Sequence, residues 1–510
     1  MDGERYIHPD SAVAAFCDAV TALSHANAKT PEWWYTWLSA RDRFNTPVFE
    51  AYLADGGDAV PAITGAGWIR LAKEVTYAVV GWLAAKRYPV SQTKADVLIV
   101  VPATPGALEN GDPIYRDPYF NSLHDVLRRG GERPLLIGMP VGPRWATVRA
   151  LARRVDVPAT SMFHFLSLAQ IVRAAWRAAQ ARFSLPPLRF PSGEPAGSYL
   201  SRALAAERGH IFFGAMMEAA ARRFLIEHPA ARVIHTYENH PWERAVDKEA
   251  AAARRDVVGY LHCAVLPSHL KNYIAPEERA WRPAPSRIVC TGAAAREVFL
   301  SLGAHASDRV EAGCDLRGPD RKWMLVRDAP PNRIETVLVL LEGLWSMTRL
   351  LRFLAKAADA LDGKKLLLRA HPVLPLRALL AVSGVSLVPG RLEESGAATL
   401  EDALAEADAV LYQSSTAAMT ALAMGVPLIK VRLPGPLEDD PLFACPTLKE
   451  TVSAPADLGP AISRLEGMTA EAFLRKRDAA RAYLDDYLTP PDAATLAPFL
   501  PQPKPARVMQ

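Results

Sequence analysis

The chain has 510 residues, of which 50% are apolar, 22% are charged and 8% are aromatic. That composition excludes a disordered chain, a collagen and a coiled coil, and the length suits about three domains' worth of residues. The 59 Lys and Arg residues nearly balance the 55 Asp and Glu residues. Because nucleic-acid binders usually carry a clustered basic excess, we expect no nucleic-acid partner.

The five cysteines are scattered, and no two of them form a Cys-x-x-Cys pair. We therefore expect neither a disulfide framework nor a zinc site, and a cytoplasmic location. The polar, acidic N-terminus does not match a signal peptide, and no run of about 18 apolar residues predicts a membrane span. We also expect that the protein can associate peripherally with the inner face of the inner membrane. The sequence leaves the oligomeric state open.

Residues 1–90 are predicted to form an N-terminal helical segment with a dense aromatic patch. Trp33, Trp34 and Trp37 follow a spacing that places at least two of them on one helical face. Residues 91–318 are predicted to form a Rossmann-like acceptor lobe, because continuous apolar runs alternate with amphipathic helices. Its predicted strands are residues 95–101, 134–138, 231–237, 257–262 and 286–290, and its predicted helices include 167–183, 241–254 and 293–302.

A polar stretch at residues 316–335 is interpreted as the linker between lobes. Residues 319–488 are predicted to form a second Rossmann-like lobe, which binds the donor nucleotide, and residues 489–510 a Pro-rich tail. The predicted strands are 336–341, 365–369, 386–388, 409–412 and 427–431, and the predicted helices are 346–361, 400–406, 415–424, 455–466 and 470–487. The sequence thus predicts an α/β fold in which two Rossmann-like lobes face a cleft.

Three motifs of the second lobe could hold a phosphate. In Arg369-Ala-His371-Pro372, the imidazole follows a strand and can donate a hydrogen bond to a phosphate or a leaving oxygen. The glycine of the Glu342-Gly343 turn allows close approach of the backbone to a ligand.

The third motif is Ser414-Ser415-Thr416, which opens a predicted helix. Hydroxyls and free N–H groups at a helix start can hold an anion, although plain N-capping explains the same residues.

The stretch 237–243 at the end of a first-lobe strand is almost wholly polar or aromatic. Glu238 is the candidate general base there, and Glu243 is expected on the helix surface. The candidate acceptor-side residues are Tyr237, Asn239, His240 and Trp242. No metal ion is expected, because Asp439-Asp440 is interpreted as a surface loop and His262 as a structural histidine.

In their order along the chain, these motifs resemble the CMP-sugar-dependent glycosyltransferases of GT-B fold, which include bacterial sialyltransferases and Kdo transferases. The stretches YENHPWE, LEG, RAHP and SSTAAMTALAMGVP are also similar to a family of bacterial surface-carbohydrate biosynthesis proteins, over about residues 95–435. The sialyltransferase pattern has two acids and a glycine at the base, whereas here Asn239 and His240 follow Glu238, so the identity of the base stays open.

The resemblance implies a GT-B-like fold and a metal-independent, inverting glycosyltransferase with no cofactor beyond its nucleotide-sugar substrate. The donor would be a CMP-activated sugar such as a nonulosonic acid or Kdo, and the acceptor a bacterial surface glycan or glycolipid. By this resemblance His371 contacts the CMP phosphate, Ser414, Ser415 and Thr416 hold it, and Glu238 is the base. Two alternatives stay open: a GT-B-fold sugar-nucleotide epimerase, and a non-catalytic subunit of a polysaccharide assembly system.

Overall fold

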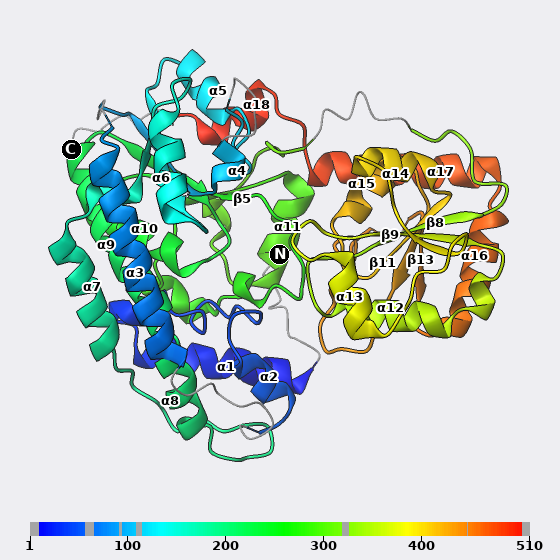
Figure 1. Ribbon diagram of the computed structural model, residues 1–510, viewed down its shortest axis with the longest axis horizontal. Coiled ribbons are helices and arrows are strands. Elements are labelled where there is room, and N and C mark those ends of the chain that lie inside the picture. The colour runs from blue at the N-terminus through cyan, green and yellow to red at the C-terminus, as the bar shows by residue number, and fades with distance from the viewer. Residues whose placement is uncertain are drawn as a thin grey trace. The chain divides into compact units, whose positions relative to one another are not determined.

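The computed structural model of the chain describes residues 10–56, 66–90, 94–108, 115–318, 326–445 and 447–501. They form two compact units (Figure 1). Unit 1 contains the described residues up to Cys263, His269–Arg317 and those from Thr489 onward. Unit 2 contains Ala264–Ser268 and the described residues from Gly318 to Leu488.

Unit 1 is built on a seven-stranded sheet in which every neighbouring pair is parallel. From edge to edge its strands are β3 (Ala159–Ser161), β2 (Pro134–Pro140), β1 (Val97–Ala103), β4 (Arg232–Thr236), β5 (Val257–Leu261), β6 (Arg287–Cys290) and β7 (Val310–Ala312). Strands β2, β4 and β5 are buried along their whole length, and β1 is buried at every residue except Pro102. The apolar runs of β1, β2 and β5 predict this burial.

The helices of unit 1 surround this sheet. The α-helices are α1 (Ser11–Ala26), α2 (Val48–Leu53), α3 (Ala66–Arg87), α4 (Pro105–Leu108), α5 (Leu123–Arg129), α6 (Arg144–Arg153), α7 (Leu168–Gln180), α8 (Gly197–Ala206), α9 (Arg208–Glu227), α10 (Pro241–Ala252), α11 (Ala293–Leu302) and α18 (Ala493–Leu496). The 3-10 helices are η1 (Pro31–Tyr35), η2 (Met162–Phe165), η3 (Leu270–Asn272), η4 (Pro276–Ala280), η5 (Ser307–Arg309) and η9 (Ala497–Phe499).

Unit 2 is built on a six-stranded, fully parallel sheet. Its strands are β10 (Leu392–Glu394), β9 (Lys365–Arg369), β8 (Thr336–Leu340), β11 (Ala409–Tyr412), β12 (Leu428–Val431) and β13 (Lys449–Val452). Its helices are α12 (Met347–Lys356), η7 (Asp359–Leu361), α13 (Leu376–Ser383), α14 (Leu400–Glu406), α15 (Ala417–Ala423), η8 (Pro455–Asp457), α16 (Leu458–Glu466) and α17 (Ala470–Tyr487). Figure 1 shows α14, α15 and α17 along one face of this sheet and α12 and α13 along the other.

Both sheets share one strand order. Counted along the chain within each unit, the first six strands are arranged 3-2-1-4-5-6, so the order reverses between β1 and β4 in unit 1 and between β8 and β11 in unit 2. Open α/β sheets bind ligands beyond the carboxyl ends of the strands at such a reversal. Each unit therefore has one edge at which functional side chains are expected.

The prediction of an α/β chain with two Rossmann-like units and an N-terminal helical segment is confirmed. The predicted cleft between the two lobes stays a prediction. Some details of the strands were wrong or missed. Residues 386–388 form no strand, and the edge strand is β10 instead. Strand β12 is not the last one, because β13 follows it, and the strands β3 and β7 were not predicted. These edge strands are three or four residues long and lack a continuous apolar run, which is the pattern that marks a buried strand.

The aromatic N-terminal segment packs into unit 1, although it is not one continuous α-helix. Trp33 and Trp34 lie in the 3-10 helix η1 and are buried, while Trp37 lies beyond its end. The expected shared α-helical face is therefore wrong. Arg41 anchors the segment through a buried ion pair of 2.9 Å with Glu278.

The C-terminal described residues also belong to unit 1. Phe499 is fully buried and packs edge-on against Tyr260 of β5, with 5.3 Å between ring centroids. None of the helices that the structure describes is long and apolar enough to cross a membrane.

Candidate active site

The turn after β4 is held by a buried carboxylate at the start of α10. Glu243 accepts hydrogen bonds from the N–H groups of Glu238 and His240, at 2.9 Å each, and from the hydroxyl of Thr236 at 3.0 Å. Glu243 has no exposed surface, so its expected place on the helix surface is wrong. Burial raises the pKa of Glu243 to about 7. This residue fixes the turn that carries the functional side chains.

Asn239 is a second anchor of this turn. Its φ of 60° lies in the left-handed region, which asparagine tolerates better than most residues. Its amide donates to the carbonyl of Lys271 at 2.6 Å, and its oxygen accepts from Arg244 at 2.9 Å. Arg244 also donates to the hydroxyl of Ser39 at 2.7 Å, which ties the N-terminal segment to the turn. Asn239 is buried, and these bonds give it a positioning role.

Tyr237 and Trp242 flank the turn and are both buried. The Tyr237 ring meets Phe299 edge-on at 6.1 Å, and the Trp242 ring meets His235 at 5.9 Å. The acceptor-side role expected of them stays a prediction, and in this structure they pack within unit 1.

Glu238 emerges from the turn into a cluster of nitrogen groups. Its Oε2 lies 2.6 Å from Nζ of Lys271 and 3.6 Å from Nε2 of His240, and its Oε1 lies 3.5 Å from Nε2 of His262. Burial alone would raise the pKa of Glu238, but the charge of Lys271, helped by the two imidazoles, lowers it well below its usual range. Glu238 is therefore ionised, and as a proton acceptor it is weakened by its ion pair.

The two histidines beside Glu238 are neutral near pH 7. Burial lowers the pKa of His240 to about 4 and that of His262 to about 4, even though the negative charge of Glu238 acts in the opposite direction. His240 keeps part of its side chain exposed and meets the ring of Trp37 edge-on at 5.1 Å. A neutral imidazole next to a carboxylate can accept a proton from a hydroxyl group.

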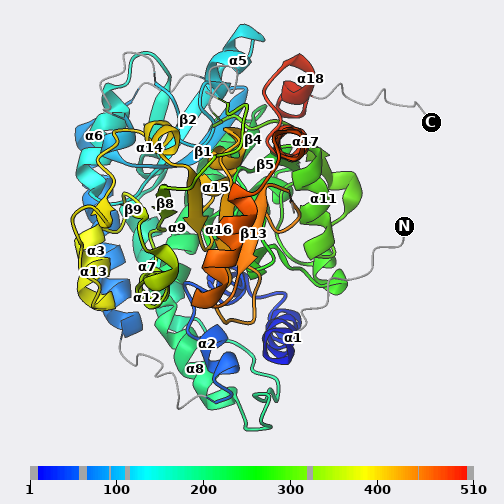
Figure 2. The same ribbon diagram turned by 90° about the vertical axis from the view of Figure 1, so that its right-hand side faces the viewer.

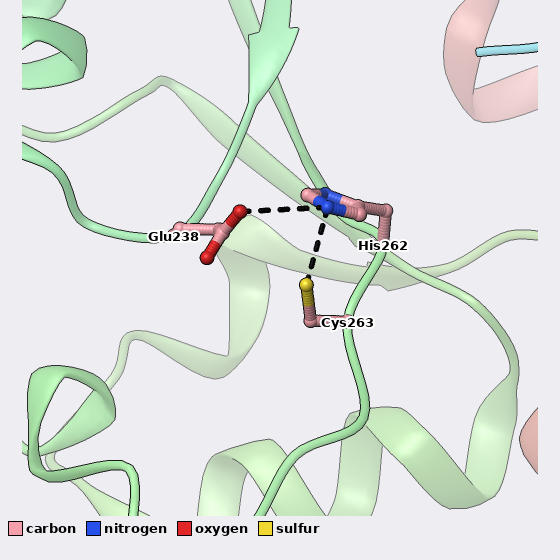
Figure 3. A group of neighbouring side chains, drawn as sticks. All are labelled: Glu238, His262 and Cys263. Carbon is pink, nitrogen blue, oxygen red and sulfur yellow. Dashed lines mark hydrogen bonds and ion pairs between the residues drawn. The ribbon is translucent and has the colours of Figure 1, made fainter. Parts of the chain in front are cut away.

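Glu238, His262 and Cys263 together could hold a metal ion, because one ligand atom from each lies within 4.8 Å of the others (Figure 3). His262 Nε2 lies 3.1 Å from Sγ of Cys263. The ammonium group of Lys271 already pairs with Glu238, which opposes a cation there. Without a metal, burial raises the pKa of the Cys263 thiol to about 12. The expectation that no metal binds stays a prediction.

In unit 2, four predicted residues come together at the carboxyl ends of neighbouring strands. Ser414, which follows β11, donates a 2.8 Å hydrogen bond to the carboxylate of Glu342, which follows β8. A Cβ atom on Gly343 would lie only 3.0 Å from Nδ1 of His371, so the absence of a side chain lets the imidazole lie against this turn. The carboxyl ends of β8, β9 and β11 are neighbours in the sheet, which explains this convergence.

The geometry of His371 fixes which nitrogen carries its proton. Nδ1 accepts a hydrogen bond of 3.2 Å from the N–H group of Val373, so the neutral ring carries its proton on Nε2. Both His371 and Pro372 are exposed. The imidazole is therefore an exposed donor at the carboxyl edge of the sheet.

Ser415 and Thr416 lie at the start of α15, which begins later than predicted. Thr416 is the N-cap residue, but its side chain makes no capping hydrogen bond, and the helix spans only seven residues. Ser415 is buried and Thr416 is exposed. The anion-binding role of these hydroxyls stays a prediction, and so short a helix supplies a weak dipole.

An ionic network supports the loop between β11 and α15. Lys430 is buried and donates both to the carbonyl oxygen of Gln413 and to Asp439, the latter at 2.6 Å. Asp440 is also buried and pairs with Lys449 at 2.7 Å. The interpretation of Asp439-Asp440 as a surface loop is therefore wrong for Asp440, because Asp440 is buried. Both carboxylates pair with lysines. The side-chain oxygen of Gln413 is buried and has no hydrogen-bond partner among the described residues.

Sequence reasoning missed Lys271, Cys263 and the part that His262 plays in the first cluster. Lys271 lies 33 residues beyond Glu238 in a short 3-10 helix, where no local pattern links the two. His262 and Cys263 carried a usable signal, because they directly follow β5, the strand beside β4.

No family model and no curated protein matches the chain. Solved structures of similar fold include Anabaena Alr3699/HepE in complex with UDP and glucose, at 12% identity and a TM-score of 0.43 over 77% of this chain and 95% of that one. WaaG, a glycosyltransferase involved in lipopolysaccharide biosynthesis, is 13% identical, with a TM-score of 0.41 over 79% and 99% of the two chains. UDP-GlcNAc 2-epimerase from Methanocaldococcus jannaschii is 10% identical, with a TM-score of 0.41 over 76% and 98%. Because the sequence identities and TM-scores are this low, the roles of single residues rest on the geometry of this chain alone.

Proposed function

We propose that the chain is a glycosyltransferase that moves a sugar from a nucleotide-activated donor onto an acceptor hydroxyl group. The observation that carries this proposal is the chemistry at the two strand reversals. Unit 1 presents a carboxylate and two neutral imidazoles there, which suit proton transfer. Unit 2 presents an exposed imidazole N–H, a hydroxyl and a glycine turn, which suit a phosphate.

Unit 2 is the proposed donor site. His371 Nε2 would donate to the leaving phosphate, and the backbone at Gly343 leaves room for a ligand. The hydroxyls of Ser415 and Thr416 would complete the phosphate contacts, joined by Ser414 when its O–H turns from Glu342 to the ligand. Pro372, which has no N–H group, would only pack against the ligand. The motif resemblance favours CMP as the nucleotide and a nonulosonic acid or Kdo as the sugar.

Unit 1 is the proposed acceptor site. The acceptor oxygen attacks the anomeric carbon, the bond from that carbon to the phosphate oxygen breaks, and the nucleotide leaves with the bonding electrons. The proton of the acceptor hydroxyl passes to the Glu238–His240 pair. Inversion at the anomeric carbon follows from a single displacement.

A thermal-shift series with CMP, UDP and GDP tests the donor, because a ligand at 100 times its Kd stabilises the native state by about 2.7 kcal/mol. We expect the largest shift with CMP and loss of that shift in His371→Ala. A larger shift with UDP would assign the donor to UDP-sugars. Release of an epimerised sugar from the donor alone would favour the epimerase, and nucleotide binding without turnover of any donor would favour a non-catalytic subunit.

A further inference from the structure

Three neighbouring helices of unit 1 expose a run of large apolar side chains. Helix α3 packs against both α6 and α7, as Figures 1 and 2 show. An ion pair of 3.5 Å between Arg144 of α6 and Glu74 of α3 links the first two helices. The exposed apolar residues of this α3/α6/α7 face are Trp68, Ile69, Tyr77, Leu83, Trp145, Leu168, Val172 and Trp176.

Core packing does not account for these side chains. Helix α7 buries one stripe, made of Ile171, Ala174 and Ala178, against unit 1. Leu168, Val172 and Trp176 recur every four residues on its other side and are exposed. The exposed fraction is 66% for Trp176, 52% for Trp68 and 41% for Trp145. So large an apolar surface on neighbouring helices indicates an interaction site.

The charges of the same helices are strongly one-sided. Together α3, α6 and α7 contain nine Lys or Arg residues and a single acidic residue, Glu74, which pairs with Arg144. The whole chain is nearly balanced, at 59 basic and 55 acidic residues. Lys73, Arg149 and Arg173 are exposed on these helices. Arg177 pairs with Glu32 and Glu218, and the other basic residues still leave an excess on the helices that expose the tryptophans.

We propose that the α3/α6/α7 face binds the surface of an anionic lipid bilayer. Tryptophan and tyrosine rings favour the headgroup level of a membrane, and Lys and Arg are attracted to its anionic lipids. Helices with apolar and basic side chains lie in that interface without crossing it. A second copy of the chain fits this face less well, because pairing two such faces would bring basic side chains together. The proposal is independent of the reaction assigned above.

Co-sedimentation with phosphatidylglycerol vesicles, phosphatidylcholine vesicles and no vesicles tests this proposal. We expect binding to the anionic vesicles, much weaker binding to the neutral ones, and a decrease with added salt. Removal of Lys73, Arg149 and Arg173 by substitution with Gln should weaken partitioning by roughly fivefold for each charge. Val172→Ser combined with Trp176→Ser should also weaken it, by about tenfold or more.

Matched control variants lie in unit 2. Trp345→Ser changes a tryptophan of similar exposure, 56%, and Lys356→Gln with Arg377→Gln removes exposed charges. These controls should bind the anionic vesicles like the unmodified chain. The proposal is overturned if the chain does not bind, if it binds both lipids equally, or if the α7 variants bind unchanged. It is also overturned if light scattering shows a dimer that the α7 substitutions dissociate, because a second copy would then occupy the face.

Discussion

Nζ of Lys271 lies 2.6 Å from Oε2 of Glu238, and this contact joins a 3-10 helix to the carboxyl end of β4. Each charge shifts the other: burial alone would lower the pKa of Lys271, yet the carboxylate raises it above its usual range, and the ammonium lowers the pKa of Glu238. The pair therefore stays ionised across the physiological pH range. Any change at Lys271 should be visible in how Glu238 titrates.

Lys271→Met should move the acid limb of the pH profile of kcat/KM to higher pH. Without the ammonium group, burial dominates and the pKa of Glu238 rises, so the base is protonated at a higher pH. The profile is measured from about pH 4 to pH 9, with Lys356→Met as the matched control. An acid limb that stays in place in Lys271→Met would show that Glu238 is not the group whose ionisation limits the reaction.

Glu238→Gln should mainly lower the rate of transfer, whereas His371→Ala should mainly weaken nucleotide binding. Glu238→Gln keeps the size of the side chain and removes its charge, so it should lower kcat by about 10²–10⁴-fold and leave nucleotide affinity nearly intact. His371→Ala removes a phosphate donor and should weaken nucleotide binding by about 1.5–3 kcal/mol. Nucleotide titration and transfer rates are measured for both variants.

The control for Glu238→Gln is the exposed Glu277, since Glu243 is buried and holds the turn. Glu277→Gln should behave like the unmodified chain. An active Glu238→Gln enzyme beside an inactive Glu342→Gln enzyme would move the base to the other carboxylate.

Gly343→Ala should weaken nucleotide binding through His371. The added methyl group would lie 3.0 Å from Nδ1 of His371, the atom that accepts from Val373, so the ring must move by a few tenths of an ångström. We expect a loss of affinity of up to about tenfold, smaller than that of His371→Ala. Gly459→Ala is the control, because a Cβ atom there has no neighbour within 4 Å. Equal affinities for both variants would show that the imidazole does not depend on this turn.

The free energy of unfolding should fall as the pH rises from about 6.5 to 9. Burial alone would lower the pKa of His235, but Asp247, whose Oδ1 lies 2.8 Å from Nε2, raises it to about 9. A pKa that folding raises contributes stability that is complete below the unfolded value and is lost as the pH passes the folded one. The loss is at most on the order of 3 kcal/mol.

Urea unfolding at pH 6 and pH 9 measures this effect. Glu243, whose pKa is raised to about 7, adds a fall in the same direction between about pH 4 and pH 7. His235→Gln should flatten the dependence above pH 6.5. A dependence of equal slope in that variant would exclude His235 as its source.

The apolar runs of the sequence predicted the central strands of both sheets, because a strand buried on both faces needs such a run. Strand β9 and strand β11 begin and end at the predicted residues. The edge strands β10 and β13 were missed, since their sequences, LEE and KETV, carry no such run. Their place depends on pairing with β9 and β12, which is a tertiary property.

The candidate site was predictable where a residue closely follows the end of a strand, as Glu238, Glu342 and His371 do. The residues that shift the pKa of Glu238 and hold its turn in place were not predictable. Lys271 is distant in sequence, and the burial of Glu243 depends on how α10 packs beneath the turn. A carboxylate three residues after a helix N-cap, as Glu243 is after His240, is typical of both a surface cap and a buried one, so only the packing distinguishes them.

The burial of Phe499 against Tyr260 has a consequence for the order in which the chain is synthesised. Unit 1 receives this core side chain from a segment that is synthesised after the whole of unit 2. The core of unit 1 therefore stays incomplete until this last segment has been synthesised, while unit 2 can already fold. Shortening the chain at Leu488 should leave unit 2 intact and unit 1 prone to aggregation, although the deleted residues lie far from the candidate site in sequence.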